Sequence, residues 1–97
     1  MAVLHVTGIL QAKPGTEGTV GPSLKQFAEV SRTHDGCIRY DPYESTSTPG
    51  TFITVEEWRD QAALDAHLSS RELQDILAHA DQLFIEDGVS IHPLKEL

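Results

Sequence analysis

The stretch over residues 36–70 constrains the fold most, because it predicts two strands, a turn and the start of a helix in immediate succession. Residues 37–45 and 51–58 are both rich in the aromatic and β-branched residues that strands favour. Between them, Pro49 fixes φ and Gly50 accepts a positive φ, so the chain can reverse and return antiparallel. The two segments therefore predict a β-hairpin.

A helix is expected directly after Trp58, where alanine and leucine begin to dominate the sequence. Asp60 is a favourable residue for capping the N-terminus of that helix. Four residues then follow one another at helical spacing, namely Ala63, Leu64, His67 and Leu68. The second strand of the hairpin is thus predicted to lead straight into a helix.

A strand and a first helix are predicted before the hairpin. Apolar and polar residues alternate over 3–11, which is typical of a half-buried strand. Gly18 and Gly21 weaken the turns that come next, so we expect the regular helix to begin near Pro22 and to end at residues 34–36.

A further helical segment and a last strand are predicted after the hairpin and its helix. Leucine and isoleucine recur at helical spacing over 73–84, after a break at the serine pair 69–70. The Asp-Gly pair at 87–88 predicts a turn. The last strand is expected over 89–94, where Pro93 is typical of an edge strand or a bulge.

The predicted order of elements is β, α, β, β, α with a break, β, which indicates an α+β, ferredoxin-like βαββαβ fold in a single domain over residues 1–97. Its four-stranded antiparallel sheet would carry helices on one face only. The other face would leave apolar surface in water, which monomers seldom tolerate, so we expect a homodimer joined sheet to sheet. The apolar residues expected at this contact are Val3, Ile9, Phe52 and Trp58.

Charge and hydropathy exclude several classes of partner. Seven basic and fifteen acidic residues give a net charge of −8, which repels nucleic acid and anionic lipid. No apolar run approaches the ~20 residues of a membrane span. Residues 1–11 alternate in polarity and read as a strand rather than a signal peptide, and the single cysteine Cys37 fits a reducing compartment, so we expect a cytoplasmic protein.

His67 is the first candidate for chemistry, because a histidine can transfer a proton near neutral pH and can hydrogen-bond to a developing oxyanion. It is placed on the helix that follows Trp58. The alternative is a structural histidine that bonds a carboxylate such as Glu56 and fixes the helix on the sheet. Cys37 is expected to be a small buried residue and not a nucleophile.

Aromatic residues of the hairpin are candidates for a pocket that accepts a flat aromatic substrate. These residues are Trp58, Tyr40, Tyr43 and Phe52. Plain core packing or a dimer interface would explain the same residues. The polar groups that could orient a substrate are Tyr40, Thr54, Glu56, His5 and Thr7, and the strand register decides which of them point inward.

No metal or organic cofactor is expected. The five histidines show none of the short spacings that bring metal ligands together. They are His5, His34, His67, His79 and His92. The sequence also has no glycine-rich dinucleotide motif.

The segments GCIRYDPYEST, PGTFITVEEW and AALDAHL resemble the middle of the antibiotic biosynthesis monooxygenase (ABM) family, whose members are dimeric α+β barrels. The family pattern of an acid two residues before a tryptophan, with a histidine in the next helix, falls on Glu56, Trp58 and His67. Haem-degrading relatives of this barrel carry an asparagine on the first strand. The chain has none there, so haem is not expected.

This resemblance implies a cofactor-independent monooxygenase that oxidises a quinol- or phenol-type aromatic with O2. His67 or Glu56 would serve as the base, since an electron-rich substrate can itself reduce oxygen once it is deprotonated. One alternative is an isomerase or other proton-transfer enzyme acting on a small oxygenated metabolite. Another is a non-catalytic ligand-binding dimer, because a fold alone does not determine a reaction.

Overall fold

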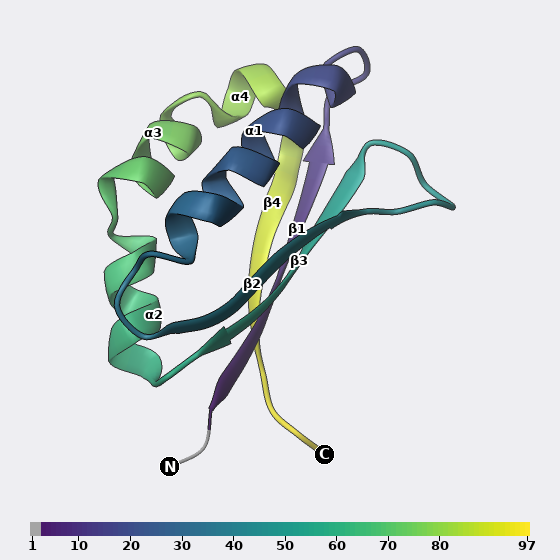
Figure 1. The fold of residues 1–97 in the computed structure, drawn as a ribbon. Helices are drawn as coiled ribbons and strands as arrows, with labels where there is room; N and C mark the ends of the chain where they lie inside the picture. Colours follow the sequence, from purple (N-terminus) through teal and green to yellow (C-terminus); the bar gives the residue numbers. More distant parts are fainter. Residues whose placement is uncertain (1–2) are drawn as a thin grey trace.

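The computed structural model describes residues 3–97 as a four-stranded antiparallel sheet with the helices on one face (Figure 1). The strand order is β2-β3-β1-β4, so β2 and β4 are the edges. The α+β, ferredoxin-like fold predicted from the sequence is confirmed. In chain order the elements are β1 (Leu4–Ala12), α1 (Glu17–Ser31), β2 (Cys37–Glu44), β3 (Thr51–Trp58), α2 (Gln61–Leu68), α3 (Arg71–Ala78), α4 (Ala80–Leu83) and β4 (Phe84–Leu94).

The register of β3 against β1 decides which side chains face the helices. Leu10 lies opposite Phe52, and Leu4 lies opposite Trp58. Successive residues of β3 alternate between buried and half-buried. The helix side of β3 therefore presents Phe52, Thr54, Glu56 and Trp58, and its open side presents Ile53, Val55 and Glu57.

Helix α1 begins earlier than the glycines led us to expect, at Glu17 instead of near Pro22. The turn before it is fixed by Thr16, whose hydroxyl lies 2.8 Å from the carbonyl oxygens of both Lys13 and Leu83 and shares its one hydrogen between them. Pro22 therefore sits inside the helix. The buried face of α1 carries Val20, Leu24, Phe27, Ala28 and Ser31.

Side-chain caps position the two helices that follow the hairpin. The Asp60 carboxylate accepts a hydrogen bond from the Ala63 backbone N–H at 2.9 Å, as predicted for the start of α2. The Ser70 hydroxyl accepts from the Leu73 N–H at 3.3 Å and starts α3. The serine pair is thus the break between two helices, and His67 lies in the last turn of α2.

The expected turn at Asp87-Gly88 is wrong, because both residues lie inside β4. They belong to a bulge, since β4 shifts register against β1 between Leu10 and Ala12. Asp87 has a φ of 57°, a value that aspartate tolerates better than most residues do. A Cβ on Gly88 would lie 2.7 Å from the Ile85 carbonyl oxygen. The Asp-Gly pair therefore bends a strand instead of ending one.

The open face of the sheet does not carry two of the four apolar residues expected at a dimer contact. Phe52 and Trp58 are 4% and 0% exposed and lie under the helices. The alternation along β3 places both side chains on one face, but which face the helices cover depends on the helix packing. The apolar open-face residues around the centre of the sheet are Ile9, Ile53 and Val55.

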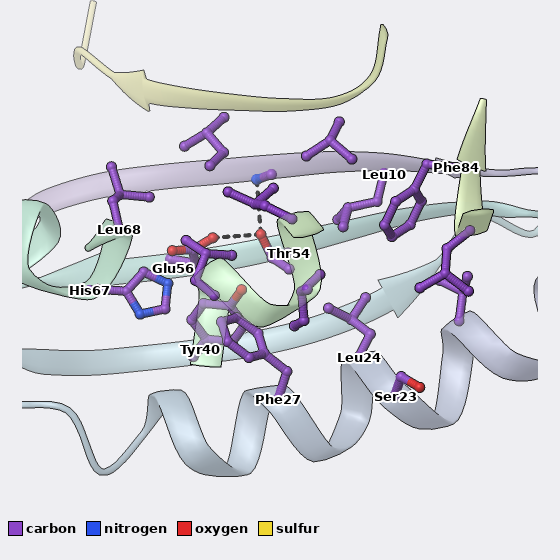
Figure 2. A pocket seen from close by; sticks show the side chains of 18 residues that line it. Leu10, Ser23, Leu24, Phe27, Tyr40, Thr54, Glu56, His67, Leu68 and Phe84 are labelled. Atoms are coloured by element: carbon purple, nitrogen blue, oxygen red, sulfur yellow. Dashed lines mark hydrogen bonds between the residues drawn. The ribbon is translucent and has the colours of Figure 1, made fainter. Parts of the chain in front are cut away.

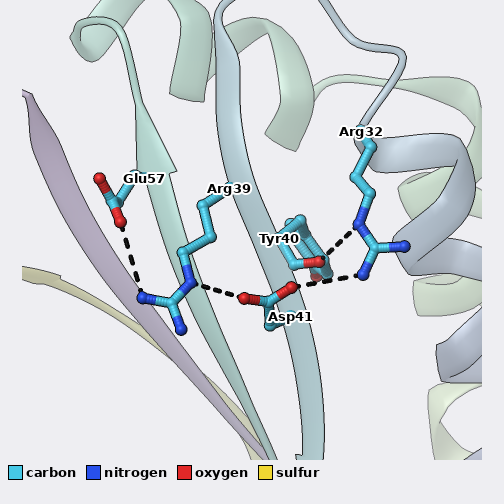
Figure 3. A network of polar contacts seen from close by, with 5 residues as sticks. All are labelled: Arg32, Arg39, Tyr40, Asp41 and Glu57. Atoms are coloured by element: carbon cyan, nitrogen blue, oxygen red, sulfur yellow. Dashed lines mark hydrogen bonds and ion pairs between the residues drawn. The ribbon is translucent and has the colours of Figure 1, made fainter.

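Ion pairs join β2 to β3 and to the end of α1 (Figure 3), and Asp41 in this network lies opposite Val55 of the apolar group. Arg39 donates to Asp41 and lies 3.7 Å from Glu57 on the neighbouring strand. Arg32, at the end of α1, donates from Nε to the Tyr40 carbonyl at 3.0 Å and lies 3.4 Å from Asp41. The network fixes the edge strand β2 to both its neighbour strand and the first helix. Within residues 3–97, no helix is long and apolar enough to cross a membrane.

Candidate functional site

A cavity of about 70 Å³ lies between the helices and the sheet (Figure 2). Most of its lining is apolar, with contributions from α1, α3 and the strands. This volume is below the ~300 Å³ typical of pockets for drug-sized ligands. The polar residues in its wall are Ser23, Tyr40, Thr54, Glu56 and His67.

Both carboxylate oxygens of Glu56 accept a hydrogen bond from a residue of its own strand. The Thr54 hydroxyl donates to Oε2 at 2.6 Å, and the Trp58 indole Nε1 donates to Oε1 at 2.9 Å. The Thr54 hydroxyl in turn accepts from the backbone N–H of Gly8 at 2.9 Å. Residues at i and i+2 of a strand point to the same face. The two hydrogen bonds to Glu56 therefore need only the extended conformation of β3.

Aromatic rings enclose His67. Its ring centroid lies 4.5 Å from that of Trp58 and 5.6 Å from those of Phe27 and Tyr40. The residue is only 3% exposed. Figure 2 shows one of its ring nitrogens directed toward the side of Glu56 and the interior of the cavity.

The other side of the His67 ring meets a second histidine. His34 Nδ1 lies 3.0 Å from His67 Nδ1, and His34 Nε2 lies 3.4 Å from the Glu72 carboxylate. His34 comes from the turn between α1 and β2, and Glu72 comes from the first turn of α3. The turn that carries His34 thus meets the adjoining helices α2 and α3, and the three side chains form one row of titratable groups.

Burial sets the protonation of the groups in the cavity. It lowers the pKa of His67 to about 4, with His34 adding to the shift and Glu72 opposing it. Burial, and then the charge of Glu56, raises the pKa of Tyr40 well above its usual value. Burial also raises the pKa of Glu56, while the hydrogen bonds from Thr54 and Trp58 oppose that shift. At neutral pH the cavity therefore holds a neutral imidazole and a protonated phenol.

The residues expected at the pocket separate into four locations. His67, Glu56, Tyr40 and Thr54 lie in the cavity wall. Trp58 lies behind His67, and Phe52 packs under Gly21 at the start of α1, where a Cβ would come within 3.5 Å of its ring. The expectation fails for His5, which lies on the open face of the sheet, as does Thr7.

The hydrogen bond between His67 and Glu56 that the structural alternative required is replaced by two separate sets of partners. Glu56 bonds to Thr54 and Trp58, and the polar partner of His67 is His34. The sequence patterns place His34 at a helix end and among five histidines without metal-ligand spacing, and they predict no role for Glu72. The sequence signal for Glu72 was slight, a carboxylate two residues after the Ser70 cap of α3. Nothing local in the sequence marks His34, because its contact spans 33 positions along the chain.

Residues 3–97 contain no group of three or more His, Cys, Asp or Glu side chains arranged to hold a metal ion. Cys37 is half-buried, and burial raises the pKa of its thiol, so the thiolate that would act as a nucleophile is disfavoured.

The chain matches known proteins over nearly its whole length. A family model described as Antibiotic biosynthesis monooxygenase matches residues 3–79. An uncharacterised protein of Synechocystis is 28% identical over 92 residues, which are 94% of this chain and 63% of that protein, so the chain spans less than two thirds of this relative. The structure of PA3566 from Pseudomonas aeruginosa superposes with a TM-score of 0.89 at 26% identity, covering 100% of this chain and 96% of that one. Rv0793 from Mycobacterium tuberculosis superposes with a TM-score of 0.87, also at 26% identity, covering 99% and 96%.

Proposed function

This chain belongs to the antibiotic biosynthesis monooxygenase family, and we propose that it oxidises a small phenol or quinol with O2 and requires no metal or organic cofactor. Family membership indicates monooxygenase-like chemistry. The observation that supports the finer proposal is the neutral, buried imidazole of His67 in the wall of a largely apolar cavity.

The reaction balances without an external reductant. A phenol that becomes a quinone loses four electrons, and O2 accepts these four electrons as one oxygen atom enters the ring and the other leaves as water. The overall change is phenol plus O2 to quinone plus water. The protein must therefore supply proton transfer and a dry environment, not electrons.

His67 is the group we assign as the base. Removing the hydroxyl proton of the substrate makes the ring electron-rich enough to react with O2. Being neutral at pH 7, His67 can accept that proton without first losing one of its own. Tyr40, which stays protonated, can donate a hydrogen bond to a reduced oxygen species or to the substrate oxygen.

Glu56 is the second candidate for the base. Both of its oxygens accept hydrogen bonds, from Thr54 and Trp58, and these bonds stabilise the ionised carboxylate and so oppose its protonation. We therefore assign Glu56 the role of a fixed negative charge in the cavity wall. Such a charge stabilises the cation that forms when His67 accepts a proton.

Oxygen uptake in the presence of a panel of phenols and quinols tests the proposal. We expect one atom of isotopically labelled O2 in the product and the other in water, with a rate that EDTA does not change. His67→Ala should lower the rate by about 10²-fold or more, because general acid-base groups contribute 10² to 10⁴. Turnover that needs an added metal or flavin would contradict the proposal.

The cavity volume favours a second candidate function, proton transfer on a smaller oxygenated metabolite. A volume of about 70 Å³ is less than half of the ~150 Å³ of an engineered cavity that binds benzene. An aromatic ring would have to displace Leu73, Ile76 or Leu77 of α3, which line the cavity. Exchange of substrate hydrogen with solvent in the absence of O2 would favour the isomerase. Saturable binding with no turnover of any kind would favour a ligand-binding dimer.

We also propose that two copies of the chain pair through the open faces of their sheets. Half-buried Ile9, Ile53 and Val55 support this, because they form an apolar group on a face that no helix covers. The ion pairs of Arg39 and Asp41 beside that group would lie toward the rim of such a contact. Covering an apolar group with a second copy stabilises the pair by about 25 cal/mol per Å² of apolar surface.

A further inference from the structure

We propose that His34 and Glu72 form a proton relay with His67, which holds His67 in the tautomer whose Nε2 is free to accept a proton from the cavity. The relay rests on the proposed function, because it matters to catalysis only if His67 is the base. His34 acts through His67 and is therefore a positioning residue.

The tautomers follow from the contacts. A carboxylate can only accept hydrogen bonds, so the favourable hydrogen position on His34 is Nε2, which lies 3.4 Å from Glu72. Neutral His34 then has a bare Nδ1. Since the two Nδ1 atoms lie 3.0 Å apart, the hydrogen between them must belong to His67. Nε2 of His67 is left as an unprotonated acceptor.

The two rings lie between two hollows of the molecule. His67 lines the inner cavity and also an outer pocket of about 340 Å³, whose wall includes His34, Arg59 and Ser70. The side chain of His34 is 19% exposed and that of Glu72 is 48% exposed. The row of three groups therefore leads from the buried cavity to a surface that solvent can reach.

A proton can pass along this row with its balance kept. The substrate proton forms a bond to His67 Nε2, and the Nδ1–H bond of His67 breaks as that hydrogen moves to His34 Nδ1. The positive charge then rests on His34 beside the Glu72 carboxylate, and Nε2–H of His34 can release a proton to Glu72 or water. His67 ends neutral with its hydrogen on Nε2, and it can pass that hydrogen to reduced oxygen while the hydrogen on His34 Nδ1 returns to His67 Nδ1. His34 Nε2 then regains a hydrogen from protonated Glu72 or water.

The relay answers a difficulty with His67 as a base. Burial makes an imidazolium at this position unfavourable, as the low pKa of His67 reflects. Moving the charge to His34 places it where a carboxylate and solvent stabilise it. The other titratable groups in the cavity wall beside the ring are Tyr40 from β2 and Glu56 from β3.

The tautomers can be measured without any substrate. In protein labelled with ¹⁵N in histidine, long-range ¹H–¹⁵N correlation spectra distinguish a protonated ring nitrogen from a bare one, and His34→Gln and His67→Gln assign the signals. We expect bare Nε2 and protonated Nδ1 for His67, with the reverse for His34. The opposite arrangement on His67 would overturn the proposal.

Glu72→Gln tests the outer end of the relay. Replacing the charge by an amide removes the strong preference for a hydrogen on His34 Nε2, so the His67 signals should become a mixture of tautomers. Glu86→Gln, an exposed change on β4, is the matched control and should leave the spectra unchanged. If the tautomers persist in Glu72→Gln, Glu72 does not set them and the relay as proposed is wrong.

Kinetics separate failure of the relay from failure of the proposed function. With a substrate found by oxygen uptake, His34→Gln should lower kcat by about 10-fold or more with KM unchanged and should alter the pH dependence of kcat. An unchanged kcat would remove His34 from the mechanism while leaving His67 as the base. If the tautomers are as expected but none of the phenols and quinols supports oxygen uptake, the result contradicts the proposed monooxygenase activity and not the arrangement of His34, His67 and Glu72.

Discussion

Trp58 donates a hydrogen bond of 2.9 Å from its indole Nε1 to Oε1 of Glu56, two residues before it on the same face of β3. The tryptophan is 0% exposed, and its ring also stacks at a tilt against His67, with centroids 4.5 Å apart. One side chain thus orients the carboxylate and forms the wall behind the imidazole. The acid-x-Trp spacing is explained by this contact, because positions i and i+2 of a strand share a face.

Replacing Trp58 by Phe should destabilise the protein by about 1 to 3 kcal/mol at neutral pH, since a buried carboxylate loses one of its two donors. The same change should raise the pKa of Glu56 further. Chemical denaturation measures the first effect, and NMR titration of the carboxyl carbon measures the second.

Glu56→Gln supplies the control for this prediction through a double-mutant cycle. If the indole acts through the carboxylate, Trp58→Phe should cost less in the Glu56→Gln background than in the wild type. Equal costs in both backgrounds would mean that the effect of Trp58 is one of packing alone.

The fold was predictable from local patterns, as the hairpin and the start of α2 illustrate. The Pro49-Gly50 turn and the Asp60 cap each depend on a few adjacent residues, and both lie where the sequence places them. The prediction failed where a distant contact decides the outcome. Thr16 fixes the start of α1 by bonding to Leu83, which lies 67 positions away. The bulge at Asp87-Gly88 likewise requires the neighbouring strand.

The candidate site was partly predictable for the same reason. Glu56 and Trp58 lie on one strand, so their shared face follows from the sequence. Their burial under the helices does not, because it depends on which face α1 covers. His34 was missed because its nearest functional neighbour is on another element. The spacing of residues along the chain does not indicate that the turn after α1 meets the end of α2 and the start of α3.

Gly8 is required by the approach of two strands, and Gly8→Ala tests this. A Cβ at that position would lie 2.7 Å from the Thr54 hydroxyl oxygen, which bonds both Gly8 N–H and Glu56. We expect a loss of about 1 to 3 kcal/mol in the free energy of unfolding, since the hydroxyl must move away from its partners.

Gly18→Ala is the matched control, because a Cβ at that position in α1 would meet no atom within 4 Å. This change should be neutral or should stabilise the protein by up to ~1 kcal/mol, as alanine favours helices over glycine. Similar losses for Gly8→Ala and Gly18→Ala would show that the strand contact does not matter.

The proposed sheet-to-sheet dimer predicts a mass of about twice 10.7 kDa by light scattering. Val55→Asp should give monomers with a retained fold, because it places a charge at the centre of the open face. Val55 lies there between Thr7 of β1 and Asp41 of β2 in the same sheet. Gln26→Asp, on the exposed side of α1, adds a charge elsewhere and should remain dimeric. A wild-type protein that is monomeric at micromolar concentration would rule this interface out.

The pH dependence of stability should reveal the buried imidazole of His67. Its pKa is lowered from 6.5 to about 4 in the folded protein, so between these values the unfolded chain binds a proton that the folded one does not. Protonation therefore favours unfolding, and stability should fall by roughly 1 to 3 kcal/mol as the pH drops through this window.

Burial raises the pKa of Glu56, so this carboxyl group contributes with the opposite sign: it lowers stability as the pH rises above 4.5. Comparison with His67→Gln isolates the histidine, because Glu56 titrates in both proteins. We expect the wild type to lose stability relative to His67→Gln as the pH falls from 7 to 4.5. If the two curves of unfolding free energy against pH run parallel, His67 binds protons equally well in the folded and unfolded states and the prediction is wrong.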